Sequence, residues 1–161
     1  MRTWILIGAL YAITSASAQD SGFGIGLIVG EPTGISMKGW LDGEHAIAGA
    51  LAWSLGHGGV FHLHADYLIH KMDLITVGKG KLPLYFGPGL RLRFWNGDRY
   101  WHKKEWHHGA TTTVAFRFPV GLNYLFDGAP VDLFFELVPT LDLVPATWFG
   151  VDFGIGGRYW F

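Results

Sequence analysis

Bulky apolar residues alternate with small or polar residues through most of the chain, and this period of two limits the folds it can adopt. Near the start, Phe23, Ile25 and Leu27 alternate with Gly24 and Gly26. Two residues is the repeat of a β-strand, whose successive side chains point to opposite faces, whereas a helix repeats every 3.6 residues. No competing helical period stands out in the sequence. The alternation therefore predicts an all-β protein.

Turn-forming residues divide the alternating regions into eight segments. Gly, Pro, Asn and Asp gather between them, for example at Asp42-Gly43 and Asp127-Gly128, as expected between antiparallel strands. Eight strands joined mainly by short turns can pair in sequence and close into an antiparallel up-and-down barrel, which removes every free sheet edge. The predicted strands cover residues 22–30, 35–41, 46–55, 60–71, 82–95, 111–126, 131–142 and 150–161.

The alternating small residues indicate which face of the barrel is inside. A water-facing strand normally carries Lys and Glu at such positions, yet only 16% of this chain is charged, against about 25% in soluble proteins. The interior of an eight-stranded barrel has room only for packed side chains, so small residues must stand opposite large ones. We therefore expect a transmembrane β-barrel whose bulky apolar face contacts lipid. The alternative is a soluble periplasmic lipocalin-like carrier, whose apolar face would point inward.

Charged residues fall on the same face as the small ones. An isolated charge could not be enclosed in a narrow interior, because its burial costs several kcal/mol, whereas a paired and hydrogen-bonded set can be. We therefore expect an interior ion-pair network that fills the barrel and leaves no wide pore. Its predicted members are Lys38, Asp66, Arg91, Arg93, Arg117, Asp132, Glu136, Asp142, Asp152 and Arg158.

Proline and aromatic residues add two further expectations. Pro88, Pro119 and Pro139 fall inside predicted strands although proline cannot donate a ladder hydrogen bond, so bulges or different strand ends are expected there. Aromatic residues near strand ends, including Trp40 and Trp95, are expected to form the girdles that flank the lipid-facing band of a membrane barrel.

The first 18 residues have the organisation of a secretory signal peptide. Arg2 precedes an apolar stretch over residues 4–13, and Ala16 and Ala18 supply the small side chains that signal peptidase requires at its cleavage site. An apolar run of about ten residues is shorter than the ~20 that a spanning helix needs, which disfavours an N-terminal membrane anchor. We expect cleavage after Ala18, one barrel domain over residues 19–161, and localisation in the bacterial outer membrane.

Two histidines and an aspartate of the predicted strand 60–71 raise a metal hypothesis. His62, His64 and Asp66 share one face of a predicted strand, a spacing that can present two imidazoles and a carboxylate to one ion. Inside a barrel rich in carboxylates and guanidinium groups, the same side chains can instead belong to the ion-pair network. The sequence favours the structural role and leaves metal binding open.

The long polar connection over residues 96–110 is the candidate surface-binding loop. An even number of strands places both termini on the periplasmic side, so this connection points outward. Its cations could contact lipopolysaccharide phosphates and its Trp residues suit the membrane interface, although a solvated hairpin extension would have the same composition. The candidate binding residues are Arg99, Trp101, His102, Lys103, Lys104, Trp106, His107 and His108.

Composition and motifs exclude several other classes of function. A net charge of -1 argues against a nucleic-acid partner, and the absence of cysteine excludes thiolate metal sites and iron-sulfur clusters. Ser54 and His57 are close in sequence but lie in no informative nucleophile motif, so we expect no enzyme activity and no cofactor. The rival in this class is a lipid-modifying outer-membrane barrel enzyme.

The carboxyl terminus and several internal segments resemble known bacterial barrels. The signal peptide, the alternating strands and the final Tyr159-Trp160-Phe161 resemble the small outer-membrane barrels of the OmpA and OmpX type. This resemblance implies a monomer in contact with outer-membrane lipid and lipopolysaccharide, with Tyr159 and Phe161 as the terminal signal for the barrel-assembly machinery. More narrowly, the chain is similar to a family of short outer-membrane barrels of uncharacterised function, without established catalytic residues, at residues 30–34, 62–67, 80–85, 123–126 and 128–130.

Overall fold

The computed structural model describes residues 21–54, 60–95, 100–102, 105–107 and 111–161, and the expected signal peptide lies outside them. None of the described residues forms a helix long and apolar enough to cross a membrane. The strands are β1 (Phe23–Glu31), β2 (Thr33–Trp40), β3 (His45–Ser54), β4 (Val60–Lys71), β5 (Leu84–Phe86), β6 (Gly89–Trp95), β7 (Tyr100–His102), β8 (Glu105–His107), β9 (Thr111–Arg117), β10 (Val120–Leu125), β11 (Val131–Val144) and β12 (Trp148–Trp160).

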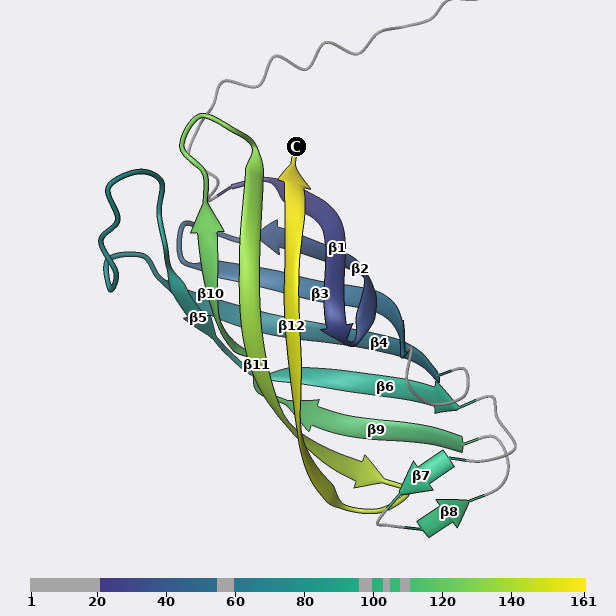
Figure 1. The fold of residues 1–161 in the computed structure, drawn as a ribbon. Helices are drawn as coiled ribbons and strands as arrows, with labels where there is room; N and C mark the ends of the chain where they lie inside the picture. The colour runs from purple at the N-terminus through teal and green to yellow at the C-terminus, as the bar shows by residue number, and fades with distance from the viewer. Residues whose placement is uncertain (1–20, 55–59, 96–99, 103–104, 108–110) are drawn as a thin grey trace, which may run out of the picture.

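Ten of these strands form one antiparallel sheet that closes on itself (Figure 1). The ring runs through β1, β2, β3, β4, β6, β9, β11 and β12, and β12 pairs with β1 to complete it. β5 pairs with β4 and β10, and β10 pairs with β11, so these two short strands continue the lines of β6 and β9. The eight-stranded antiparallel ring expected from the sequence is therefore present, with two of its strand lines interrupted.

Prolines cause both interruptions. Pro88 separates β5 from β6 and Pro119 separates β9 from β10, while Pro139 lies opposite the second break on the continuous strand β11. Their carbonyl groups still bond across the wall: Pro88 accepts from Tyr67, Pro119 from Gly87 and Pro139 from Phe118. The three prolines thus lie on adjacent strand lines. The hydrogen bonds that their carbonyl oxygens accept connect neighbouring strands where the prolines lack an N–H donor.

Burial separates the two faces of the wall. Ile25, Leu51 and Phe153 are 38%, 39% and 55% exposed, whereas Arg117 and Glu136 inside the ring are 0% and 7% exposed. The alanines at alternate positions of β3, from Ala46 to Ala52, are also buried. The predicted orientation, with bulky apolar side chains outward and small or charged side chains inward, is confirmed.

Two aromatic predictions are wrong. Trp40 shares the inward face of β2 with Lys38, and its ring lies 4.3 Å from that of His70. Trp95 donates from Nε1 to Thr113 Oγ1 at 3.3 Å, and Thr113 is buried inside the ring. Both residues occupy the inward parity of their strands. The prediction that they belong to the outer girdles rested on their position near strand ends and ignored this parity.

The connections also differ from expectation. The predicted loop over residues 96–110 contains a two-stranded hairpin, in which β7 pairs with β8 and Trp101 is opposite Trp106 in the backbone register. On the other side of the barrel, β5 begins at Leu84, two residues later than predicted, which leaves residues 72–83 as a second long connection. The β2–β3 turn is short, and the pKa of Asp42 is lowered by hydrogen bonds from the backbone N–H groups of Glu44 and His45 and from the His45 ring.

We predict that Leu137→Arg, in the middle of β11, will lower the unfolding free energy in lipid vesicles by about 2–4 kcal/mol, because a cation at mid-bilayer loses its hydration. Leu137 is 48% exposed, so in a water-soluble barrel the same change would cost less than about 0.5 kcal/mol. Leu41→Arg, the same change at an exposed residue of the β2–β3 turn at the end of the barrel, is the control and should cost at most about 1 kcal/mol. Equal costs for the two variants, measured by urea unfolding, would contradict a lipid-facing outer wall.

Candidate functional site

The interior of the barrel holds a column of charged side chains, which forms the candidate site. β4, β6, β9, β11 and β12 supply most of these side chains, while the inward faces of β1, β2 and β3 are mainly Gly, Ala and Ser. The ion pairs divide the column into three clusters. They are described in order from the end of the barrel that carries the β7–β8 hairpin to the end that carries the carboxyl terminus, two ends that Figure 1 shows.

The first cluster lies toward the β7–β8 end and joins two arginines to two aspartates. Arg91 donates from Nη2 to Asp142 Oδ1 at 2.7 Å and from Nη1 to Asp152 Oδ2. Arg93 donates from Nη2 to Asp142 Oδ2 at 3.0 Å. Asp142 therefore links the two guanidinium groups, and each predicted charge in this cluster has an opposite partner.

The second cluster crosses the middle of the barrel around Arg117. Its Nε lies 3.0 Å from Asp66 Oδ1, and its Nη2 donates to Glu136 Oε1 at 3.2 Å. The Tyr85 hydroxyl donates to the other Glu136 oxygen at 2.8 Å, and His64 Nε2 lies 3.6 Å from Asp66 Oδ2. Arg117 thus pairs with two carboxylates, and Tyr85 holds one of them, Glu136, from the other side.

Two glycines provide the space for this cluster. A Cβ at Gly89 would overlap the Asp66 carboxylate, and a Cβ at Gly121 would overlap the Tyr85 ring and the Phe135 carbonyl. Both glycines lie on inward positions of strands that face the large polar side chains. The alternation of small and large residues in the sequence is therefore the condition that lets Asp66 reach Arg117 and Tyr85 reach Glu136.

The third cluster, at the end that carries the termini, departs from the prediction. Arg158 donates from Nε to Asp132 Oδ1 at 3.1 Å, as an ion pair. Lys38, however, contacts neutral groups within the described part of the chain: its Nζ lies 2.7 Å from His70 Nε2 and donates to Asn123 Oδ1 at 2.8 Å. Lys38 was predicted as a member of an ion pair and is instead held by an imidazole and an amide.

Aromatic rings take the place of a carboxylate beside Lys38. Its Nζ lies 4.3 Å from the Trp40 ring centroid and 5.9 Å from that of Trp160, and the two indoles stack with centroids 6.1 Å apart. A cation over an indole face is stabilised by the ring quadrupole, most strongly when it is desolvated. Asn123, Tyr85 and Trp40 were not predicted for this interior, although all three lie at inward positions that the period of two identifies.

The histidines of β4 line the interior beside these clusters. His64 Nδ1 lies 3.3 Å from His62 Nε2, and both rings are buried. Within the described residues, no group of three His, Asp or Glu side chains has an arrangement that could hold a metal ion. His62, His64 and Asp66 therefore contact one another as part of the polar filling, and the metal hypothesis gains no support from their geometry.

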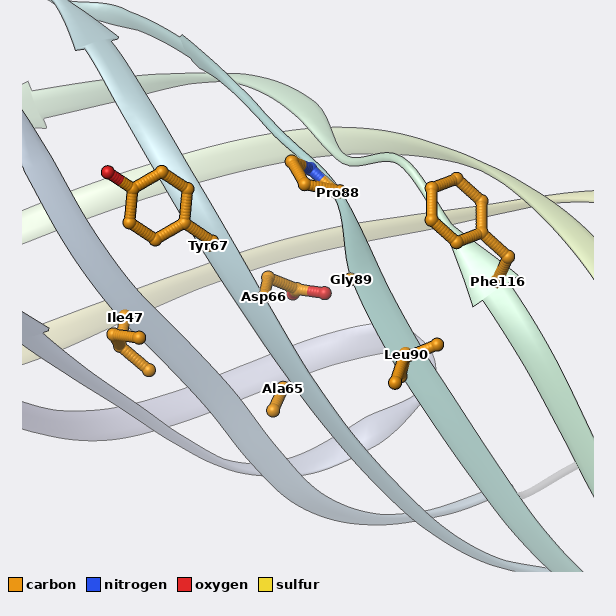
Figure 2. A pocket seen from close by; sticks show the side chains of 8 residues that line it. All are labelled: Ile47, Ala65, Asp66, Tyr67, Pro88, Gly89, Leu90 and Phe116. Carbon is orange, nitrogen blue, oxygen red and sulfur yellow. The ribbon is translucent and has the colours of Figure 1, made fainter.

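The outer wall has a hollow beside the first proline interruption, with a volume of about 430 Å³. Figure 2 shows Ile47, Tyr67, Leu90 and Phe116 around it, with Pro88 and Gly89 at its centre. The Asp66 carboxylate next to Gly89 belongs to the interior cluster (Figure 2). The lining is almost entirely apolar, which suits contact with hydrocarbon better than binding of a polar substrate.

The remaining predicted residues lie at the ends of the barrel. Trp101, His102, Trp106 and His107 belong to the backbone of the β7–β8 hairpin. Tyr159 is exposed on β12, and Phe161 donates its N–H to Phe23 O at 2.9 Å. The residues of the surface loop and of the rejected Ser–His pair that lie outside the described part are Arg99, Lys103, Lys104, His108 and His57.

Comparison with known proteins supports the fold. No family model matches the chain, and a search of curated proteins finds no significant match. Among solved structures, the fold is similar to the N-terminal β-barrel domain of Pseudomonas aeruginosa OprF, with a TM-score of 0.61 and 15% sequence identity. The superposition covers 89% of this chain and 100% of that domain. At this level of identity the likeness concerns the β-barrel fold.

We predict that Arg117→Met will lower the unfolding free energy by roughly 3–5 kcal/mol, because Asp66 and Glu136 would be left buried without their cation. Adding Asp66→Asn and Glu136→Gln to the same protein should recover much of this loss, since the unpaired charges are then removed. His45→Gln, which removes the exposed pair with Asp42 and a ring contact with Tyr67, serves as the control and should cost less than about 1 kcal/mol. A triple variant no more stable than Arg117→Met would show that the three charges are not coupled.

Proposed function

We propose that this protein is a small integral outer-membrane barrel with a structural role in the envelope. In this proposal a signal peptide over residues 1–18 delivers the chain, and the mature barrel makes its surface contacts through residues 96–110. The barrel acts as a scaffold and catalyses no reaction. The fold likeness to the OprF barrel domain supports the architectural part of the proposal.

The observation that carries the proposal is the reversed polarity of the wall. Large apolar side chains such as Leu27, Val151 and Ile155 are 64%, 59% and 58% exposed, while the charged side chains of the three clusters lie inside. A soluble protein rarely exposes a contiguous apolar surface of this extent. Hydrocarbon is the solvent for which such a surface is suited, which favours a membrane barrel over a soluble carrier.

The direction of the barrel in the membrane follows from its topology. The carboxyl terminus and the β7–β8 hairpin lie at opposite ends (Figure 1). With the termini in the periplasm, residues 96–110 project from the cell surface, where lipopolysaccharide phosphates are available to its cations. Residues 72–83 then lie on the periplasmic side.

The filled interior supports a barrel that is closed to solutes. The three clusters occupy successive levels, and Arg91, Arg117, Asp132 and Asp142 are each at most 2% exposed. A water-filled channel would leave charged side chains in its lumen solvated. We therefore infer that the barrel conducts no bulk solute.

Two measurements on detergent-refolded protein test the barrel and its closure. We expect heat-modifiable gel migration, because a closed barrel resists denaturation until it is boiled, and no long-lived conductance of porin size in planar bilayers. Migration unchanged by boiling, together with recovery of the protein in a soluble cell fraction, would indicate the soluble carrier. Changed lipid A masses in cells that produce the protein would indicate the lipid-modifying enzyme.

Replacement of residues 97–109 by a short Gly-Ser linker tests the surface contact. We expect the barrel to refold with the same heat-modifiable migration, because the ring closes below this loop, and to bind lipopolysaccharide at least about fivefold more weakly, as expected when charge-assisted phosphate contacts are lost. Lys103→Gln with Lys104→Gln should give part of the loss. Unchanged lipopolysaccharide binding would remove the surface-contact role and leave a purely structural one.

A further inference from the structure

The connection between β4 and β5, residues 72–83, is long for the end of the barrel at which it lies. The other connections at this end span residues 41–44 and 126–130. Membrane barrels usually have short turns on the periplasmic side. In Figure 1 the connection projects beyond β4 and β5, at the end where the chain terminates. Its length exceeds what is needed to join two adjacent strands.

The last part of this connection is fixed next to the outward face of the barrel. Tyr124 has the outward parity of β10, since its neighbour Leu125 is buried inside, and its hydroxyl donates to the Lys79 carbonyl at 3.0 Å. Gly80 adopts a φ of +69°, which favours glycine, and lies beside the Tyr124 ring. Backbone hydrogen bonds of 2.8 and 3.0 Å between Lys81 and Leu125 hold the following residue. The segment is therefore held close to an outward-facing aromatic residue.

The level of this attachment matches a membrane interface. Tyr124 packs edge-to-face on Phe126 with ring centroids 4.7 Å apart, and Phe126 is exposed at the end of the wall. Outward aromatic pairs at the ends of barrel strands sit at the headgroup level of the bilayer. Lys79 is therefore placed beside the boundary between hydrocarbon and water.

The side chains of the connection combine an apolar tip with cations. Leu74 is 64% exposed and is followed by Ile75, Thr76 and Val77, an apolar sequence for a water-facing loop. Lys71 is exposed on the outward face of β4, and Lys79 is exposed beside Tyr124. Within residues 72–83 the one acidic residue is Asp73. Apolar residues beside lysines are the combination with which segments bind at an anionic membrane surface.

We propose that residues 71–79 form a binding site for anionic phospholipids of the periplasmic leaflet. Lys71 and Lys79 contact the headgroup phosphates, and Leu74 inserts at the level of the first acyl carbons. This site rests on the proposed membrane location but is separate from the cell-surface loop. Its two lysines distinguish it from the neighbouring outer wall, whose exposed side chains are mainly apolar and aromatic.

Lipid selectivity in vesicles tests the site directly. The full mature chain is refolded in phosphatidylcholine vesicles that contain a trace of spin-labelled phosphatidylglycerol or spin-labelled phosphatidylcholine, and the relative association of the two labels is measured. We expect a preference of about threefold or more for phosphatidylglycerol, which decreases in high salt. Lys71→Gln with Lys79→Gln should remove most of it, whereas Lys71→Arg with Lys79→Arg should retain it.

Lys103→Gln with Lys104→Gln is the matched control, because it removes the same charge from the other end of the barrel. This variant should keep the preference. The proposal is overturned if the wild-type protein shows no preference, if Lys71→Gln with Lys79→Gln retains it, or if only the control variant loses it. Heat-modifiable migration is read on the same vesicles: failure to insert overturns the membrane location and this site together, whereas insertion without preference overturns the site alone.

The absence of cysteine from the chain permits a second test of the apolar tip. A spin label on Leu74→Cys should be more accessible to oxygen, which concentrates in the bilayer, than to a water-soluble nickel chelate. The same label on Gly43→Cys, at an open position of the short β2–β3 turn, should show the opposite order. A label at position 74 as accessible to the chelate as the one at position 43 would exclude insertion of the tip.

Discussion

The pairing of buried charges is the interaction on which the rest of this structure depends. A cylinder of eight strands encloses too little space for hydrated ions, so each cation must find its partner across the interior. Asp142 between Arg91 and Arg93, and Arg117 between Asp66 and Glu136, satisfy this condition. The charges can stay buried because they are paired. Separating the pairs would cost free energy, because each group would be left as an unpaired buried charge.

This pairing determines where small residues are required. Most of the long polar side chains extend from β4, β6, β9, β11 and β12, and the inward faces of β1 to β3 are mainly Gly, Ala and Ser, with Lys38 and Trp40 of β2 as exceptions. Gly89 and Gly121 show the same requirement at single positions, because a Cβ at either would displace the Asp66 carboxylate or the Tyr85 ring. The small residues of the wall are thus required by the same buried polar side chains that form the interior clusters.

The backbone obeys a separate constraint: every strand of a closed ring has a neighbour on both sides, so its N–H and C=O groups must find partners across the wall. Three prolines remove three donors from the wall, and they do so on adjacent strand lines. The hydrogen bonds that Pro88, Pro119 and Pro139 accept retain the pairing of the neighbouring strands at that level. The outer hollow of Figure 2 lies at the first of these interruptions, and Gly89 and the small side chain of Ala65 are part of its lining.

The period of two determined much of this protein by itself: the strand content, the order of pairing, the face of each strand and therefore the inward position of every predicted charge. Those properties follow from local geometry, because alternate side chains on a strand must point to opposite sides. Tertiary structure alone decided which groups meet across the interior. Lys38 contacts His70 and Asn123 in place of a carboxylate, because strand tilt and register set the distances between residues that are 32 and 85 positions apart in the chain. The inward direction of Trp40 and Trp95, by contrast, follows from the parity of β2 and β6. Tertiary structure also decided that residues 79–81 lie beside Tyr124, a contact between two connections that no repeat in the sequence encodes.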